Sequence, residues 1–356
     1  MKNGTKNNSV WLILAVLLVI PFALQAEIWE VVKKKEINKS FHVNKDCLLF
    51  VDNSFGNITI TYWAKQEASI QVEVKSVASR EQNTQQNLDR VKVDIRKVGD
   101  KISAVTFLEN ANRDGRKNEQ LTINYHISVP STMKMELSQR FGNINLPSEN
   151  EGENTITVKF GNLNAGSFTK NLLVDAKYSN VILGGLAQAD LSFSFCGEVD
   201  LQSGKFLTVD SKYSTLRIGD VEELKMGQKY GNLRTGELKK AFLDIKYSNS
   251  KIEKLTDELI VENLDYSTLD VLELSADFKR VEVESRYGTL GICISPKASF
   301  KIIAERIGNN LSIEKLKETK HTVENKSDHY VEINGGKSGI INFEGNKYSN
   351  LKIRAK

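Results

Sequence analysis

Apolar and polar residues alternate with a period of two along many short stretches of this chain. Leu172, Val174 and Ala176 occupy every second position of one stretch, and the charged residues Asp175 and Lys177 stand beside them. This alternation is typical of a β-strand that buries one face. Pairs of small polar residues interrupt it at regular intervals, after which it resumes. The pattern therefore predicts short strands joined by tight turns.

The strands belong to a repeat that opens on an aromatic residue, followed by a small residue and then, in most copies, by Asn or Thr. From Phe141 to Tyr287 the aromatic residue recurs at intervals of roughly 17 to 21 residues, a period that marks a stacked repeat architecture. In such an architecture each repeat buries its apolar face against its neighbours. The aromatic residues are Phe55, Phe141, Phe160, Tyr178, Phe195, Tyr213, Tyr230, Tyr247, Tyr266, Tyr287 and Tyr348.

The repeats predict an all-β protein, a right-handed parallel β-helix (β-solenoid) with coils of roughly 17–21 residues. Helical repeats would need apolar residues at spacings of three and four, whereas these use spacing two with aromatic and β-branched residues. We expect the aromatic residues to form a buried, inward stack, so that Tyr230→Ala would lower stability by about 3–5 kcal/mol. Lys229, which should point outward, would contribute little. The Asn and Thr residues should hydrogen-bond the turn backbone or one another.

Three sections follow along the chain. Residues 1–26 have the features of a signal peptide, with basic residues, an apolar run and a small residue, Ala26, at the expected cut. The run is short for a membrane span, so a cleaved signal is favoured over a retained anchor. Residues 27–135 are β-rich without a regular period, and form either a small β-domain or an irregular cap. Residues 136–356 carry the solenoid repeats.

Outside the regular repeats, the local pattern also predicts individual elements. It predicts a short helix or exposed crossover over Ser79–Arg90 and a charged loop over Asn110–Gln120. Glu314–Asp328 is charged and is predicted to be a loop or short helix, and Tyr330–Lys356 should supply the closing strands. Further strands are predicted at Ile70–Val74, Val91–Ile95 and Leu121–Val129.

One family resemblance rests on the turn element. Phe55–Ile58 and Phe141–Ile144 both read Phe-Gly-Asn-Ile, and His126–Pro130 supplies a strand before the turn. These stretches resemble the bacterial putative-adhesin domains of unknown function, including the auto-transporter adhesin head type. The resemblance covers most of the chain after residue 40. It implies a secreted β-helical protein of the cell envelope and provides no catalytic residues.

Groups that usually carry chemistry are sparse. Of the three cysteines, Cys196 and Cys293 should lie five coils apart, roughly 24 Å at 4.8 Å per coil, too far for a disulfide. The four histidines (His42, His126, His321 and His329) do not cluster in sequence, so no metal site is expected. The chain contains no phosphate loop or dinucleotide fingerprint. We therefore predict no catalytic residue and no cofactor.

Net charge argues against a nucleic-acid partner. The formal charge is +4, and two of those charges, Lys2 and Lys6, lie in the predicted signal. Nucleic-acid binders usually carry a larger basic excess.

Charged residues repeat on one face of the predicted coils. A basic residue precedes the aromatic at Arg140, Lys159, Lys177, Lys212, Lys229, Lys246, Arg286 and Lys347. In four coils an acid stands two positions earlier, which gives a strip of Asp175, Lys177, Asp210, Lys212, Asp244, Lys246, Glu284 and Arg286. The strip is either a charge-balanced solvent face or a binding strip for an extended polyanion or glycan.

Two functions fit these features. The first is a non-enzymatic, exported, adhesin-like scaffold in the periplasm, on the outer-membrane surface or outside the cell. It would present an extended surface to a glycan or another envelope or cell-surface polymer, and would contact a membrane only through an uncleaved signal. The alternative is a polysaccharide lyase or hydrolase on a β-helix, whose chemistry the carboxylates and lysines of the strip would carry. Analogy of fold is a weak reason for that second function.

Overall fold

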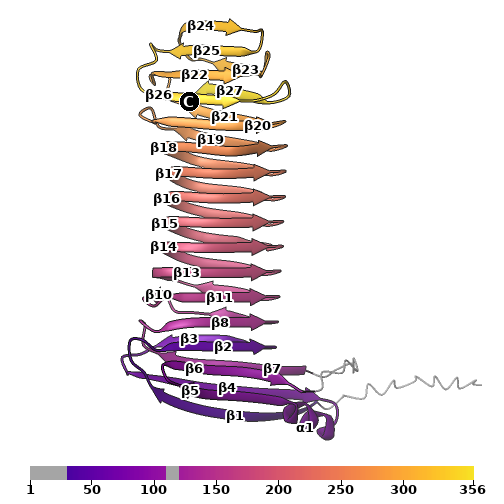
Figure 1. Cartoon of the computed structure of the whole chain (residues 1–356). Coiled ribbons are helices and arrows are strands. Elements are labelled where there is room, and N and C mark those ends of the chain that lie inside the picture. The colour runs from indigo at the N-terminus through magenta and orange to yellow at the C-terminus, as the bar shows by residue number, and fades with distance from the viewer. Residues whose placement is uncertain (1–29, 110–119) are drawn as a thin grey trace, which may run out of the picture.

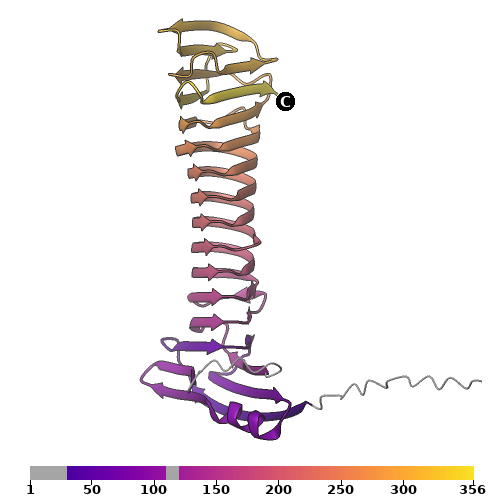
Figure 2. The ribbon, with the colours of Figure 1, turned by 90° about the vertical axis from the view of Figure 1, so that its right-hand side faces the viewer.

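The computed structural model describes residues 30–109 and 120–356. The predicted signal at 1–26 and nearly all of the loop predicted at Asn110–Gln120 lie outside these residues. The described part is all-β, with one short helix and a long, mostly parallel sheet whose strands stack along one axis (Figures 1 and 2). Within those ranges, no helix has the length and apolar character needed to cross a membrane.

The central strands pair in parallel with a nearly constant register. Val174 pairs with Leu191, which in turn pairs with Val209, so each residue faces the equivalent residue of the next repeat. We call one aromatic corner, with the strands before and after it, a layer. The central strands are β10 (Glu149–Asn150), β11 (Asn154–Lys159), β12 (Asn162–Ala165), β13 (Ser167–Lys177), β14 (Asn180–Ser194), β15 (Val199–Lys212), β16 (Thr215–Lys229), β17 (Asn232–Lys246), β18 (Asn249–Asp265) and β19 (Thr268–Leu274).

The N-terminal end mixes parallel and antiparallel pairs. β4 lies antiparallel between β1 and β7, and β5 pairs antiparallel with β6. The strands predicted over 70–74, 91–95 and 121–129 are confirmed in β4, β5 and β7, and α1 confirms the helical option for 79–90. The elements are β1 (Val31–His42), β2 (Leu48–Ser54), β3 (Ile58–Tyr62), β4 (Glu67–Ala78), α1 (Glu81–Asp89), β5 (Val91–Val98), β6 (Lys101–Leu108), β7 (Gln120–Val129), β8 (Lys134–Arg140) and β9 (Ile144–Asn145).

The C-terminal strands do not stack in chain order. β26 lies between β20 and β22, and β27 lies between β21 and β23, so the last segment is inserted inside the stack (Figure 1). The elements are β20 (Arg280–Arg286), β21 (Thr289–Ile294), β22 (Phe300–Glu305), β23 (Leu311–Glu314), β24 (Glu318–Glu324), β25 (Asp328–Ile333), β26 (Gly339–Glu344) and β27 (Asn350–Ala355).

The prediction of a loop or short helix over Glu314–Asp328 is wrong. Its middle is β24, which forms an antiparallel hairpin with β25. Every side chain of β24 is exposed, so the strand lacks the alternation that would reveal it. The hairpin also joins two histidines distant in sequence, with His321 Nε2 and His329 Nδ1 3.2 Å apart. In the described residues no group of three or more His, Cys, Asp or Glu side chains could hold a metal ion.

The core follows the predicted alternation up to each corner, and there the prediction fails. Leu172, Val174 and Ala176 are buried as expected, but Tyr178 is 52% exposed. The backbone of Tyr178 is left-handed, with φ of 53°, and this rotation turns its ring outward while Ser179 points inward. The predicted inward aromatic stack is therefore wrong. The large loss of stability expected for Tyr230→Ala does not follow either, since Tyr230 is also half exposed.

The three cysteines are free and buried. Cys196 occupies the inward position after Phe195, where other layers place Gly or Ser, and its thiol donates to the carbonyl oxygen of Ala176 at 3.3 Å. Burial raises the pKa of the Cys196 thiol, because the charged thiolate is disfavoured away from water.

This pKa shift predicts a protected thiol. Only the thiolate reacts readily, so Cys196 should be alkylated by iodoacetamide at pH 8 more than about tenfold more slowly in the folded protein than in urea. Mass spectrometry of the labelled peptide measures the difference. Cys196→Ser should reduce the number of labels in urea by one and leave native labelling unchanged; rapid native labelling at Cys196 would contradict the buried position.

Candidate binding face along an aromatic column

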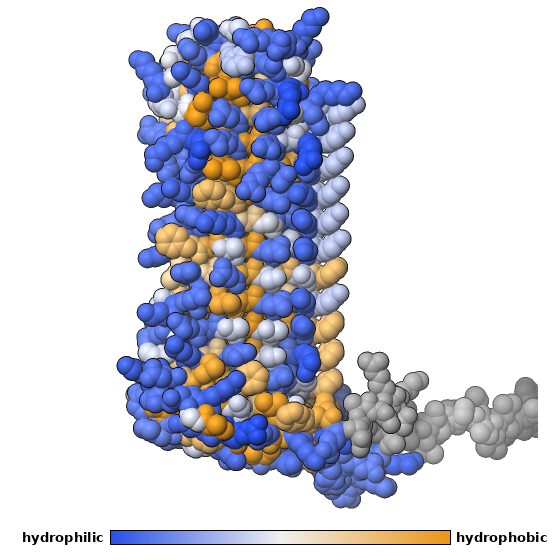
Figure 3. All heavy atoms as spheres, in the orientation of Figure 1, coloured by the Kyte–Doolittle hydropathy of each residue, from blue (hydrophilic) through white to orange (hydrophobic). Residues whose placement is uncertain are grey.

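Eleven aromatic rings, one from each layer, form a continuous column on the outside of the molecule. Neighbouring ring centroids are 4.7–5.2 Å apart and the ring planes differ by no more than 11°. The rings are 40–53% exposed. The column runs straight along the right-hand edge of the molecule in Figure 3, and its members are the eleven residues of the sequence repeat from Phe55 to Tyr348.

The corner backbone is one that aromatic residues rarely adopt. Ten of the eleven have φ between 49° and 62°, all except Tyr348. A left-handed conformation costs a bulky residue about 1–2 kcal/mol, whereas Gly or Asn adopts it easily. The chain nevertheless repeats an aromatic residue at every corner. The rings must therefore contribute something that Asn would not, either by stacking on one another or by contact with a partner.

Hydrogen bonds between layers hold each corner in place. The amide of Tyr213 donates to the Lys229 carbonyl at 3.0 Å, and the amide of Tyr230 donates to the Lys246 carbonyl at 3.1 Å. In four of the five layers where a serine follows the ring, its hydroxyl donates to the carbonyl two residues earlier, as Ser248 does at 2.8 Å. These bonds fix the ring positions, so the column is a rigid surface.

The predicted asparagine ladder is confirmed in the N-terminal layers. The Asn162 side chain donates to Asn143 Oδ1 at 2.8 Å, and Asn180 donates to Asn162 Oδ1 at 3.2 Å. The Asn143 Oδ1 atom also accepts from the Asn162 backbone amide at 3.0 Å. This ladder runs beside the column, two residues after each ring.

The charged strip lies on the other side of the column. Its residues belong to β13, β15, β17 and β20. The register puts the basic members in one row and Asp175, Asp210 and Asp244 in another, while Glu284 lies where the pairing of β18 with β20 is irregular. Lys177 contacts Asp175 at 3.5 Å and Lys246 contacts Asp244 at 3.3 Å. Arg286 instead contacts Asp265 of the neighbouring layer, at 3.3 Å. Residues two apart thus share a face, but the pairs differ from layer to layer.

The stacking limits how the column can make contact. Each inner ring has its two faces covered by the neighbouring rings, so only ring edges and tyrosine hydroxyls face solvent. The last six rings, from Tyr213 to Tyr348, are all tyrosines. The Lys347 ammonium lies 4.9 Å from the Tyr348 ring centre. A sugar ring cannot stack flat on an inner ring, but it can hydrogen-bond the row of hydroxyls.

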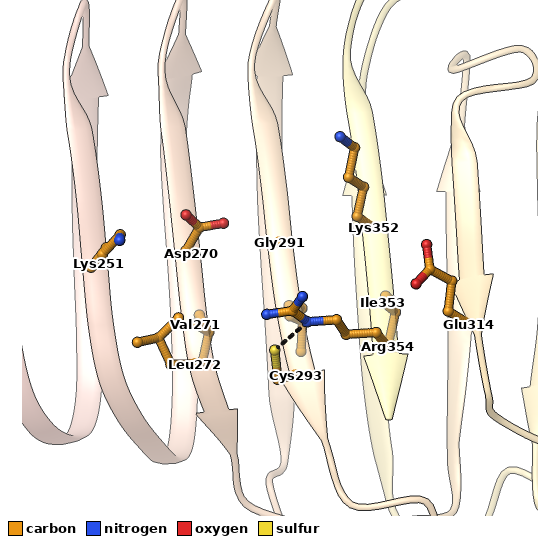
Figure 4. Close-up of a pocket in the computed structure, with 11 residues that line it drawn as sticks. Lys251, Asp270, Val271, Leu272, Gly291, Cys293, Glu314, Lys352, Ile353 and Arg354 are labelled. Atoms are coloured by element: carbon orange, nitrogen blue, oxygen red, sulfur yellow. Dashed lines mark hydrogen bonds between the residues drawn. The ribbon is translucent and has the colours of Figure 1, made fainter. Parts of the chain in front are cut away.

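A hollow lies near the C-terminal end, on the strands that follow the column. It has a volume of about 380 Å³ and opens over Gly291, whose row neighbours in adjacent layers are Asp270 and Lys352. Arg354 reaches across from β27 and donates to Cys293 Sγ at 2.9 Å (Figure 4). This contact covers the thiol, so the hollow offers charged side chains rather than a reactive sulfur.

The outward direction of the rings is the feature of the candidate site that the alternation pattern did not predict. A signal for it exists, because each aromatic is followed by Gly, Ser or Cys and, in most layers, then by Asn or Thr, which are residues typical of turns. The aromatic itself therefore belongs to the turn rather than to the end of the strand. The prediction of a buried ring came from continuing the strand alternation one position too far, onto this turn residue.

Comparison with known proteins gives structural neighbours only. No family model and no curated protein matches the chain. A putative adhesin from Parabacteroides distasonis is similar at 11% identity and a TM-score of 0.34, over 73% of this chain and 92% of that one. A putative lipid binding protein from Parabacteroides distasonis matches at 10% identity and 0.32, over 90% and 96%. A putative adhesin from Parabacteroides merdae matches at 10% identity and 0.30, over 73% and 91%.

Proposed function

We propose that this chain is a non-enzymatic, exported, adhesin-like scaffold, and that the aromatic column with its charged borders is its binding surface. The observation that carries the proposal is the exposure of eleven rings in one column. If each ring leaves about half of its ~200 Å² in water, the column exposes roughly 1,000 Å². Contiguous aromatic surface above a few hundred Å² usually marks an interaction site. The partner would be an extended glycan or another polymer of the cell envelope.

The scaffold itself would be a right-handed parallel β-helix. The register supports this, since consecutive strands pair in parallel and each pairing advances the chain by one repeat. Crossovers between parallel strands are nearly always right-handed. An experimental structure with left-handed crossovers would contradict this part of the proposal.

The acids of the strip do not have the spacing of a retaining glycosidase. Ser192 and Gly227 stand between the acids Asp175, Asp210 and Asp244 in the same row, so these carboxylates are two layers apart. That separation is ~9.6 Å at the usual strand spacing, longer than the about 5–5.5 Å of a retaining glycosidase and at the upper end of the roughly 6.5–9.5 Å of an inverting one. Asp210 forms no ion pair with Lys212 in the described residues.

Polymer binding tests the proposal directly. The triple variant Tyr213→Asn, Tyr230→Asn and Tyr247→Asn removes three adjacent rings but keeps a residue that accepts the left-handed backbone. Binding to a panel of envelope and plant polysaccharides, measured by biolayer interferometry, should fall at least about tenfold for any polymer that the wild type binds.

The control is Phe206→Ser, because Phe206 is 53% exposed but lies outside the column. It should leave binding unchanged. Shortening of a bound polymer, lost on Asp210→Ala, would favour the hydrolase or lyase alternative. Fractionation of cells that express the full chain tests export, and a cytoplasmic location would contradict it.

A further inference from the structure

The basic residues that border the column are stacked against one another. Eight of the eleven layers carry Lys or Arg directly before the ring. The register places Arg140, Lys159 and Lys177 in three consecutive layers. It does the same for Lys212, Lys229 and Lys246. Neighbouring strands are ~4.8 Å apart, and like charges directly opposite each other are destabilising.

The chain pairs only some of these cations with its own acids. Within the described residues, no hydrogen bond or ion pair involves the side chains of Lys159, Lys212 or Lys229. Lys177 and Lys246 contact Asp175 and Asp244, at 3.5 and 3.3 Å. The acids are spaced two layers apart and cannot serve every lysine. The fold thus separates its acids along the strip while it stacks its cations beside the rings.

An extended anion would relieve this repulsion. Its negative charges would have to recur at about the spacing of the layers, which is close to the length of one sugar in an extended β-linked chain. The column of eleven rings offers roughly 50 Å of such repeats, because its ten intervals each take the usual strand spacing of ~4.8 Å. Sugar hydroxyls would meet the hydroxyls of the seven tyrosines, and acidic groups on the sugars would meet the cations of the eight basic layers.

Resting on the proposed function, we infer that the ligand is a linear acidic polysaccharide, bound lengthwise along the column with its acidic groups on the lysine row. Single-stranded nucleic acid is the other extended polyanion. Its binding sites usually stack bases on aromatic faces, and in this column the neighbouring rings cover those faces. The bases would therefore gain little here, which favours the sugar polymer.

Two polymers distinguish charge from shape. Polymannuronate is a β-linked chain with one carboxylate per sugar, and hydroxyethyl cellulose is an uncharged β-linked chain. The full-length protein should bind polymannuronate at least about tenfold more tightly at low salt, and added salt should reduce that difference, because ions screen exposed charges. Affinity for mannuronate oligomers should rise with length up to about eleven sugars, one for each ring.

The decisive variant is the triple change Lys159→Gln, Lys212→Gln and Lys229→Gln. It should weaken polymannuronate binding about tenfold, since three exposed charge contacts, each weak by itself, are lost together. The matched control is Lys35→Gln, Lys45→Gln and Lys75→Gln, which removes the same charge from the N-terminal section and should change binding less than about twofold.

If both polymers bound equally well and the triple lysine variant left that binding unchanged, this inference would be overturned. The proposed function would still stand. Tighter binding of single-stranded DNA than of polymannuronate would also overturn it. If neither these polymers nor the wider polysaccharide panel bound, the inference and the proposed function would both fail.

Discussion

Phe193→Ala is expected to lower the free energy of unfolding by about 3–5 kcal/mol, the usual result of emptying a packed aromatic site. Phe195→Ala, two residues further on, should lower it by only about 1–2 kcal/mol, because it removes stacked contacts that each contribute about 0.5–1.5 kcal/mol. Phe193 is fully buried, while Phe195 is 48% exposed and stacks between Tyr178 and Tyr213. Urea denaturation followed by circular dichroism measures both changes.

The two phenylalanines are a matched pair, because they have the same side chain and belong to the same layer. Alternation with period two would place both on one face and predict similar losses. If Phe195→Ala destabilised the protein as strongly as Phe193→Ala, the column would be part of the core, and the proposed binding surface would lose its main support.

The spacing of residues predicts the strands and their shared faces, but it does not predict the φ angle of the aromatic residue at each corner. The aromatic period, the strand alternation and the shared faces of the charged strip all follow from spacing, and the register agrees with them. The exposure of Tyr178 does not follow from spacing, because a φ of 53° reverses the direction of its side chain. Alternation assumes an extended backbone, so it gives the wrong face wherever the backbone is left-handed.

The order of the C-terminal layers was also beyond the reach of local pattern. Tyr348 stacks directly on Tyr287 at 5.0 Å, although β21 to β26 all lie between them in the chain. β26 and β27 enter between strands that precede them in the chain, and β24 pairs as an exposed hairpin strand. Which strands pair with each other depends on contacts between residues that are far apart in the chain, and a repeat period does not predict those contacts.

The glycines of the layers differ in a way that residue type does not show. Gly161 lies at a corner against the backbone of the previous layer, where a β-carbon would overlap the carbonyl oxygen of Gly142. Gly227 lies in the row of strip acids, where a β-carbon would meet only Asp210 Oδ1, at 3.6 Å. Neither glycine has the positive φ that would make alanine strained. The difference between them is therefore a difference in available space.

Gly161→Ala should consequently lower the free energy of unfolding by about 3 kcal/mol, because backbone groups that pair on both sides cannot move aside without cost. Gly227→Ala should leave stability unchanged or raise it by up to about 1 kcal/mol, since alanine restricts the unfolded chain and fits the folded one. Urea denaturation of both variants measures the two effects, which are expected to have opposite signs or to differ by at least about 3 kcal/mol.

Damage from Gly161→Ala should reach the stacked rings of Phe141 and Phe160 first, because stability in a repeat protein is shared between neighbouring layers. If both glycine variants changed stability equally and only slightly, neighbouring layers would be able to move apart at little cost. A column built from such layers could not hold its rings and lysines in register with a polymer.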